Sequence, residues 1–357
     1  MNLFTRYIST LYLKYFFILF ISLEVFFVVI DLVKYLDELP NSANLIVLLL
    51  FYDFIYASQF ILPLSLILAQ IILFITMLKN SQWTAFLSLG YTKFKIFFPI
   101  FTLSFLITFI YILLNATPFA YAKEKVDLII EAGYIGSYKS DLFVKYDNKY
   151  IHFSRIYPLL KSAEGISVYE FDLNDLIVTR IIKSKRAEFV QNHWQLSDVE
   201  ITTLKKNAKL GENAVIIENE KSYSTLDGFK PKILDSIYEK QGSISILDAY
   251  DAILLLKSQG VPTNKIRASL YALLFFSLFA PLVMMILAYW SPNSNRYVNL
   301  AGLALSMILC VLVLWGIFFS FSRLSMSGFL QPEFSVILPI TLLALVSFYF
   351  VVKIARE

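Results

Sequence analysis

Residues 45–78 read LIVLLLFYDFIYASQFILPLSLILAQIILFITML, and Asp53 is the only charged residue among them. A helix needs about 20 predominantly apolar residues to cross the hydrocarbon core of a bilayer. This stretch is longer than one crossing requires, so it predicts a spanning helix that is tilted or projects from the membrane. Pro63 removes one backbone hydrogen bond inside the helix and therefore predicts a kink.

Five further apolar stretches meet the same length requirement. The six predicted spans cover residues 13–36, 45–78, 96–122, 266–290, 297–321 and 333–353. Hydrophobic residues make up 58% of the chain and charged residues 16%, against about 45–50% and about 25% in soluble domains. This composition excludes a soluble enzyme, a disordered chain and a nucleic-acid-binding protein with a basic face.

Charged residues are concentrated in the middle of the chain. Residues 123–265 hold 20 of the 31 Lys/Arg and 20 of the 27 Asp/Glu, which makes this segment a neutral soluble domain. The predicted fold class is an α-helical polytopic membrane protein with six transmembrane helices and an inserted β-jellyroll-like domain. The first three spans lie within residues 1–122, the inserted domain with flanking helices within 123–265, and the last three spans within 266–357.

The inserted segment has the sequence pattern of β-strands. Runs rich in Ile, Val, Tyr and Phe follow one another without intervening helices, which favours an antiparallel sandwich or jelly roll. The runs are KYIHFSRIY (149–157), EGISVYEFD (164–172), LIVTRIIKSKRAEFV (176–190) and HWQLSDVEITTL (193–204). The turn residues between them include Asp147–Asn148, Asn174–Asp175 and Asn192. A helix closes the domain, with Ser245 and Asp248 as its capping pattern and Gly260 as its stop.

Basic residues in short loops predict the orientation. One side of the membrane receives Arg6, Lys14, Lys79, Lys93, Lys95, Arg296, Lys353 and Arg356. The other side receives only Arg323, with Lys34 near a helix end. Both termini are therefore predicted to be cytoplasmic, and residues 123–265 to lie in the periplasm of a Gram-negative cell. The first apolar stretch is too long for a signal peptide and lacks a small-residue cleavage site, so it is predicted to be a retained helix.

Motifs for catalysis and metal binding are missing. The sequence contains no G-x-x-x-x-G-K-[ST], no G-x-S-x-G and no H-E-x-x-H, so it predicts neither ATP hydrolysis nor a zinc protease. Cys310 is the only cysteine, which excludes an internal disulfide and a multi-cysteine metal site. His152 and His193 are interpreted as ordinary surface or packed histidines. We predict a non-catalytic chain without a bound cofactor or metal.

The candidate intramembrane ionisable residues are Glu24, Asp31, Lys34 and Asp53. Such residues are costly in hydrocarbon and commonly functional. Asp31 and Lys34 are spaced i, i+3 and can pair on one helix face, and Lys34 can also extend to the membrane surface. Glu24 and Asp53 can face a protein partner or a polar cavity.

The loop between the second and third spans reads KNSQWTAFLSLGYTKFKIFFP over residues 79–99. Trp83, Phe86 and Leu87 share one face of a short helix near 81–90, and Gly90 ends it. Such a cytoplasmic helix either rests on lipid or docks in a groove of a soluble partner. Because the chain has no nucleotide-binding motif of its own, an ATPase is an attractive candidate for that partner.

The sequence resembles the LptF/LptG permease family of lipopolysaccharide-export ABC transporters over nearly its whole length. DLVKYLDEL (31–39), QFILP (59–63) and FLSLGYTKFKIFFP (86–99) are similar to the family's first span, second span and coupling segment. The LptG branch is favoured by DLFVKYDNKYIHFSRI (141–156), GISVYEFD (165–172), HWQLSDVEITTL (193–204) and LLKSQGVPTNKIRASLYALLFFSLFAPLVMMILA (255–288). LptF is the near alternative.

The resemblance implies a permease subunit in the inner membrane. It implies pairing with an LptF-like subunit, two LptB-like ATPases that use ATP and Mg, and an LptC-like periplasmic partner. Lipopolysaccharide would enter sideways past the first and fifth spans and be pushed towards a periplasmic bridge to the outer membrane. Two other classes remain open: a membrane-anchored sensor or adaptor with a β ligand-binding domain, and an intramembrane enzyme acting on lipid.

The family's functional positions carry over unevenly. The resemblance implies that Lys34 and Lys125 contact lipid A phosphates, whereas a second basic position beyond the third span is Leu128 here. In the coupling segment it implies ATPase contacts by Trp83, Phe86, Leu87 and Gly90. The family's acidic residue before them is Gln82, so an ion pair with the ATPase is lost and a hydrogen bond is expected instead.

Overall fold

The computed structural model describes residues 3–132, 139–158, 160–172, 177–205, 215–231, 243–258, 263–294 and 298–356. The chain forms two compact units. The unit that contains the apolar helices comprises Met1–Val126, Ser243–Tyr250 and Thr263–Glu357. The unit that contains the β-sheet comprises Asp127–Gly242 and Asp251–Pro262.

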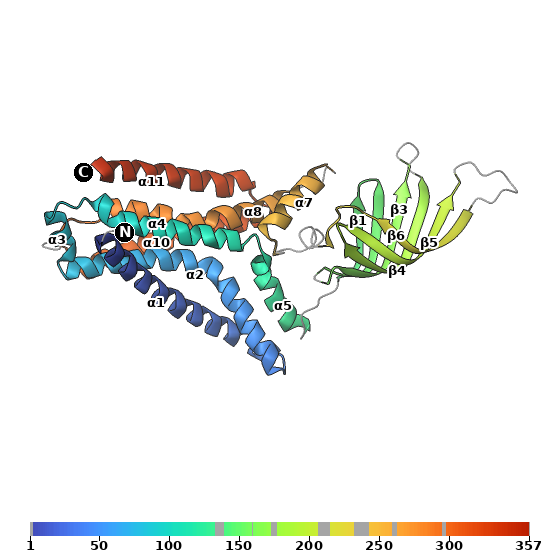
Figure 1. Cartoon of the computed structure of the whole chain (residues 1–357), viewed down its shortest axis with the longest axis horizontal. Helices are drawn as coiled ribbons and strands as arrows, with labels where there is room; N and C mark the ends of the chain where they lie inside the picture. Colours follow the sequence, from blue (N-terminus) through green and yellow to red (C-terminus); the bar gives the residue numbers. More distant parts are fainter. Residues whose placement is uncertain are drawn as a thin grey trace. The chain divides into compact units, whose positions relative to one another are not determined.

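Six helical segments of the described chain are long and apolar enough to cross a membrane, as predicted (Figure 1). They are α1 (Leu3–Lys34), α2 (Ala43–Lys79), α4 (Lys93–Leu114), a fourth span (Asn264–Tyr289), α10 (Leu300–Met326) and a sixth span (Glu333–Arg356). The fourth span consists of α8 (Asn264–Phe275), the 3-10 turn η3 (Phe276–Leu278) and α9 (Phe279–Tyr289). The sixth begins with the π-helical turn η4 (Glu333–Ile337) and continues as α11 (Leu338–Arg356).

The third span is shorter than the predicted 96–122. Helix α4 ends at Leu114, followed by the 3-10 turn η2 (Pro118–Tyr121) and by α5 (Ala122–Ala132). A residue that precedes proline is disfavoured in the helical conformation, and Thr117 is extended at φ −105° and ψ 177°. Apolar residues continue past this break, which is why hydrophobicity alone extended the prediction too far.

Helix α2 bends part-way along its length (Figure 1), and Pro63 lies inside it as predicted. Hydrogen bonds between side chains and backbone join it to two neighbouring helices. The Tyr12 hydroxyl of α1 donates to the Leu66 carbonyl oxygen at 3.1 Å. Nε2 of Gln70 donates to the Met284 carbonyl oxygen of α9 at 3.0 Å. Helix α2 is therefore tied to both α1 and α9 in the interior of the helical unit.

Helix α7 (Ile246–Ser258) begins where the capping pattern predicted. Oγ of Ser245 accepts a hydrogen bond from the Asp248 backbone N–H at 3.1 Å and donates to the Asp248 carboxylate at 2.9 Å. The first bond satisfies an amide that has no partner inside the helix. Gly260, the predicted stop, lies outside the described residues.

The start of α7 is also bonded to the segment that follows the third span. The Tyr121 hydroxyl donates to the Asp248 carboxylate, and the Ile246 N–H donates to the Asn115 carbonyl oxygen at 3.1 Å. Burial and the Asp248 carboxylate raise the pKa of Tyr121 above its ordinary value, so its hydroxyl remains protonated and continues to donate. These bonds join the two chain segments of the helical unit that flank the inserted domain.

The inserted domain is a six-stranded antiparallel sheet (Figure 1). Its strands are β1 (Lys139–Tyr146), β2 (Lys149–Tyr157), β3 (Ser162–Phe171), β4 (Val178–Val190), β5 (His193–Leu204) and β6 (Val215–Thr225). Strands β2 to β5 confirm the four predicted strands, and β1 and β6 were not predicted. Spatial order follows sequence order, so the described strands form a meander rather than the crossed connections of a jelly roll. Asn174–Asp175, a predicted turn, lies outside the described residues.

The core of the sheet unit is aromatic. Trp194 is fully buried, its ring lies 5.5 Å from that of Phe153, and its Nε1 donates to the Phe229 carbonyl oxygen at 2.8 Å. The hairpin before it turns at Gln191 and Asn192, which have φ values of 47° and 71°. Two consecutive positive φ values are typical of the tight turn that matches strand twist, as the asparagine predicted.

Candidate functional site

Lys34 is the last residue of α1. Its Nζ lies 3.7 Å from Oδ1 of Asp31 and donates to the Tyr35 hydroxyl at 3.0 Å. The predicted pairing of Asp31 with Lys34 is therefore confirmed. The Lys34 side chain is nevertheless 64% exposed, so its ammonium group remains accessible to a ligand.

Two lysines of α5 approach tyrosines of the first two spans. Nζ of Lys125 donates to the Tyr52 hydroxyl at 3.3 Å and lies 4.5 Å from the centre of that ring. Nζ of Lys123 donates to the Tyr35 hydroxyl at 3.4 Å and lies 5.2 Å from the Tyr56 ring centre. Together with Lys34, these residues form a cluster of three ammonium groups and three aromatic rings, which we call the lysine–tyrosine cluster. A cation against an aromatic face is held in place without being neutralised.

The sequence predicted Lys34 and Lys125 but missed Lys123 and the tyrosines. Two signals were present in the sequence. Tyr52 and Tyr56 are spaced i, i+4 and so share one face of a helix. Lys123 lies in the first turn of its helix, where the helix dipole disfavours cations. A residue that is locally unfavourable in this way often has a functional role.

Glu24 and Asp53 lie in the interior of the helical unit, at 0% and 2% exposure. Among the described residues, neither carboxylate oxygen of Glu24 has a hydrogen-bond partner, and the same is true of Oδ1 of Asp53. The chain's own helices cover both residues, so neither presents a surface to another protein. Asp53 nevertheless lies beside the lysines, since it interacts electrostatically with Asp31, Lys34 and Lys123.

The predicted cytoplasmic helix is α3 (Gln82–Ser88), but its apolar face packs against the chain itself. Trp83 is fully buried, with its ring 5.0 Å from that of Phe74 and 5.2 Å from that of Phe97. Phe86 lies 4.9 Å from Phe4, and Leu87 packs against the same core. The short helix covers the ends of α2 and α4, which takes Trp83 away from any partner surface.

Gly90 ends α3 as predicted. It adopts φ +84°, and the bonds from Gly90 N to Leu87 O at 3.0 Å and from Tyr91 N to Phe86 O at 3.1 Å close the helix. Leu89, directly before it, is 74% exposed. The outward apolar side chain of this segment is therefore Leu89.

Gln82 accepts a hydrogen bond on Oε1 from the Tyr7 hydroxyl at 3.4 Å.

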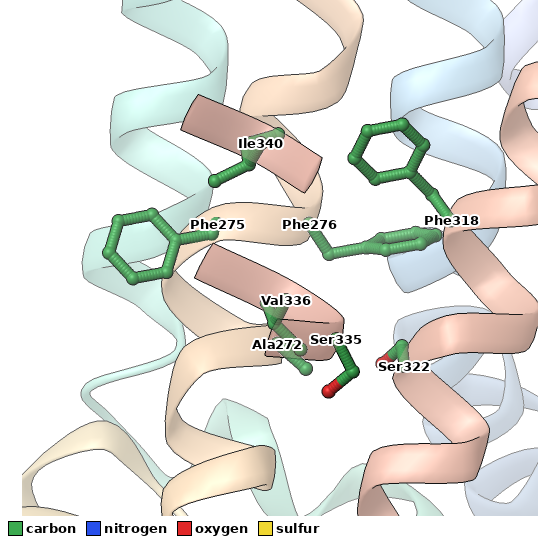
Figure 2. A pocket seen from close by; sticks show the side chains of 8 residues that line it. All are labelled: Ala272, Phe275, Phe276, Phe318, Ser322, Ser335, Val336 and Ile340. Atoms are coloured by element: carbon green, nitrogen blue, oxygen red, sulfur yellow. The ribbon is translucent and has the colours of Figure 1, made fainter. Parts of the chain in front are cut away.

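A separate small pocket lies among the last three spans (Figure 2). It is lined by Ala272, Phe275, Phe276, Phe318, Ser322, Ser335, Val336 and Ile340. The lining is apolar apart from two serine hydroxyls and contains no charged side chain. This lining therefore offers no charged group to an anion.

The described residues contain no group of three or more His, Cys, Asp or Glu side chains able to hold a metal ion. His152 lies 3.6 Å from Asp141 on the sheet, and His193 is hydrogen-bonded to the Gln191 carbonyl oxygen at 3.3 Å. The arrangement that stands out chemically is the cationic, partly aromatic cluster at one end of the first two spans.

Comparison with known proteins places the chain. No curated protein matches it. The sequence model of the family described as "Lipopolysaccharide export system permease LptF/LptG" matches residues 6–353, almost the whole chain, and the chain therefore belongs to that family.

Proposed function

We propose that this chain is the LptG-type permease subunit of a transporter that extracts lipopolysaccharide from the inner membrane and passes it to a periplasmic bridge. It pairs with an LptF-like subunit, two LptB-like ATPases and an LptC-like partner. The ATPases use ATP and Mg, and this chain supplies the path for the lipid. The LptF-type role is the alternative, and co-expression with each candidate partner followed by native mass spectrometry distinguishes the two.

The proposal is carried by the lysine–tyrosine cluster. Lipopolysaccharide bears phosphates next to its acyl chains, so its site needs cationic groups beside an apolar surface. Lys34 and Lys125 provide the cations, and exposed apolar residues of α1 such as Ile30 and Val33, at 54% and 60% exposure, provide the surface. Charge-assisted bonds to phosphate are the strong interactions available to such a site.

Photo-crosslinking from position 34 tests the proposal in native membranes. We expect a lipopolysaccharide adduct from a photoreactive residue at Lys34. The matched control is Leu113, which is 53% exposed. It lies at the C-terminal end of α4, which is predicted to be on the same side of the membrane as Lys34. Equal adducts at both positions, or none at 34, contradict a specific substrate site.

Orientation is tested by cysteine labelling in a Cys310→Ser background, because Cys310 is exposed. A cysteine at Lys185, an exposed residue of β4, is expected to react with an impermeant thiol reagent added from the periplasmic side. A cysteine at Ser294, exposed beyond α9, is expected to react only after the inner membrane is opened. The reverse pattern contradicts cytoplasmic termini and a periplasmic sheet.

A further inference from the structure

Glu24 lies in the interior of the helical unit, on a helix that packs against two others. Helix α1, which carries it, contacts both α2 and α4. The residue is fully buried, and within the described part of the chain neither of its carboxylate oxygens has a hydrogen-bond partner. Because the chain's own helices already cover Glu24, it stays out of reach of a subunit that binds to the surface.

The groups that act on Glu24 are acidic or neutral. Its carboxyl group interacts electrostatically with Asp53 of α2 and with Tyr111 of α4, and the Tyr111 hydroxyl interacts with Ser58. Thr108 lies one turn before Tyr111 on the same face of α4, and its buried hydroxyl has no partner among the described residues. No lysine or arginine of the described chain is among the groups that interact electrostatically with Glu24.

An ionised carboxylate is unfavourable in these surroundings. Its charge would lose the hydration that it has in water, and neither a cation nor a hydrogen-bond donor would replace that hydration. The carboxyl group of Asp53 adds repulsion. A bound proton removes the charge and needs no additional space. The described residues offer no third acidic, histidine or cysteine side chain with which this pair could hold a metal ion instead.

Asp53 connects Glu24 with the surface of the helical unit. It is hydrogen-bonded to the side chain of Asp31, and a bond between two carboxyl groups requires a proton between them. It also interacts electrostatically with Lys34 and Lys123, which favour a negative charge at this end. The Asp31 side chain is 16% exposed. Asp31, Asp53 and Glu24 therefore form a file of three carboxyl groups that leads from the surface to the interior.

We propose that Glu24 is a proton-binding site inside the membrane and that its proton exchanges with water through Asp53 and Asp31. In each step the proton leaves one carboxyl oxygen, an oxygen of the next carboxylate accepts it, and the negative charge moves the opposite way. Any movement of α1 that hydrates Glu24 favours release of the proton, so occupancy of the site is linked to the packing of this helix. The inference does not depend on which lipid the chain carries, and it therefore stands apart from the proposed function.

Infrared difference spectroscopy tests the site, because a protonated carboxyl group has a C=O band that a carboxylate lacks. The sample is the full chain in lipid nanodiscs, with the subunits that purify with it. We expect Glu24→Gln to remove such a band at neutral pH. Glu38→Gln makes the same change at an exposed residue just after α1 and is the matched control, with no band lost. If Glu24→Gln removes no band, the proton site is wrong.

The route is tested by the rate at which the Glu24 band shifts in heavy water. Asparagine has nearly the size of aspartate but cannot take up a proton and pass it on. Asp53→Asn is therefore expected to slow the shift severalfold while the band itself remains. Asp37→Asn, at an exposed residue after the same helix, should leave the rate unchanged. Equal rates in the two variants contradict the route through Asp53.

The dependence of thermal stability on pH provides a second readout of the site. Ionising Glu24 in its packed position is unfavourable, so alkaline pH is expected to lower the melting temperature of the unaltered chain. Glutamine cannot ionise, so Glu24→Gln should lose less stability at alkaline pH than Glu38→Gln does. Equal losses overturn the proposal. Failure of Glu24→Gln to fold also overturns it, because a neutral amide closely replaces a protonated carboxyl group.

Discussion

Replacing Leu89 by glutamate is expected to release the ATPase from the complex while leaving the permease folded. Leu89 is 74% exposed directly after α3, so its side chain contributes little to the chain's own packing. If it fills an apolar groove of the ATPase, a glutamate buried there without a partner costs several kcal/mol. We expect at least a tenfold loss of co-purified ATPase in mild detergent and an unchanged melting temperature of the permease.

Two variants complete that experiment. Leu3→Glu makes the same chemical change at an apolar residue that is 86% exposed near the N-terminus, and it is expected to leave the ATPase bound. Trp83→Ala removes a fully buried ring and is expected to destabilise the permease itself by about 3–5 kcal/mol. If Leu89→Glu retains the ATPase, and Leu87→Glu loses it without loss of stability, then the originally predicted face is the docking surface.

The spans were predictable because a bilayer leaves a chain few alternatives. Backbone N–H and C=O groups in hydrocarbon must form their hydrogen bonds within a helix. A long apolar run such as 45–78 therefore predicts a spanning helix. The end of the third span was missed although Pro118 was visible in the sequence. The residue before a proline is disfavoured in the helical conformation, so the helix ends ahead of Pro118. Apolar residues continue on both sides of the proline, and the hydrophobic pattern therefore did not indicate this end.

The strands were predictable only where one face is buried. β2 and β5 alternate buried and exposed residues over part of their length, and their predicted bounds agree with the structure. β6 is exposed at most positions and therefore shows no alternation. Its pairing with β5 comes from tertiary structure, as expected for an edge strand whose own sequence is polar.

Only part of the candidate site was predictable, because its contacts depend on tertiary structure. An amphipathic pattern such as that of Trp83, Phe86 and Leu87 shows that a face is covered but not what covers it. Here α2 and α4 of the same chain cover it, which no local pattern reveals. Lys123 and Tyr35 lie far apart in sequence, and only the tertiary structure brings the Lys123 side chain to the Tyr35 hydroxyl.

Charge reversal at Lys34 is expected to have the largest effect on lipopolysaccharide loading. A charge-assisted hydrogen bond to phosphate contributes roughly 1.5–3 kcal/mol, and about 1.4 kcal/mol is a factor of ten. Lys34→Asp removes that bond, repels the phosphate and places a second carboxylate beside Asp31, so lipopolysaccharide loading should fall by more than about tenfold. Loading of the purified complex with phosphorylated lipopolysaccharide, in the absence of ATP, measures this step separately from transport.

The order of a short substitution series identifies the physical cause. Lys34→Arg keeps the charge and changes the geometry, so it should be partly tolerated, and Lys34→Met should fall between it and Lys34→Asp. Lys14→Asp alters net charge equally at an exposed residue nearer the other end of α1 and should leave loading unchanged. Equal losses for the arginine and aspartate variants would mean that Lys34 serves packing, because a phosphate contact must respond to the sign of the charge that faces it.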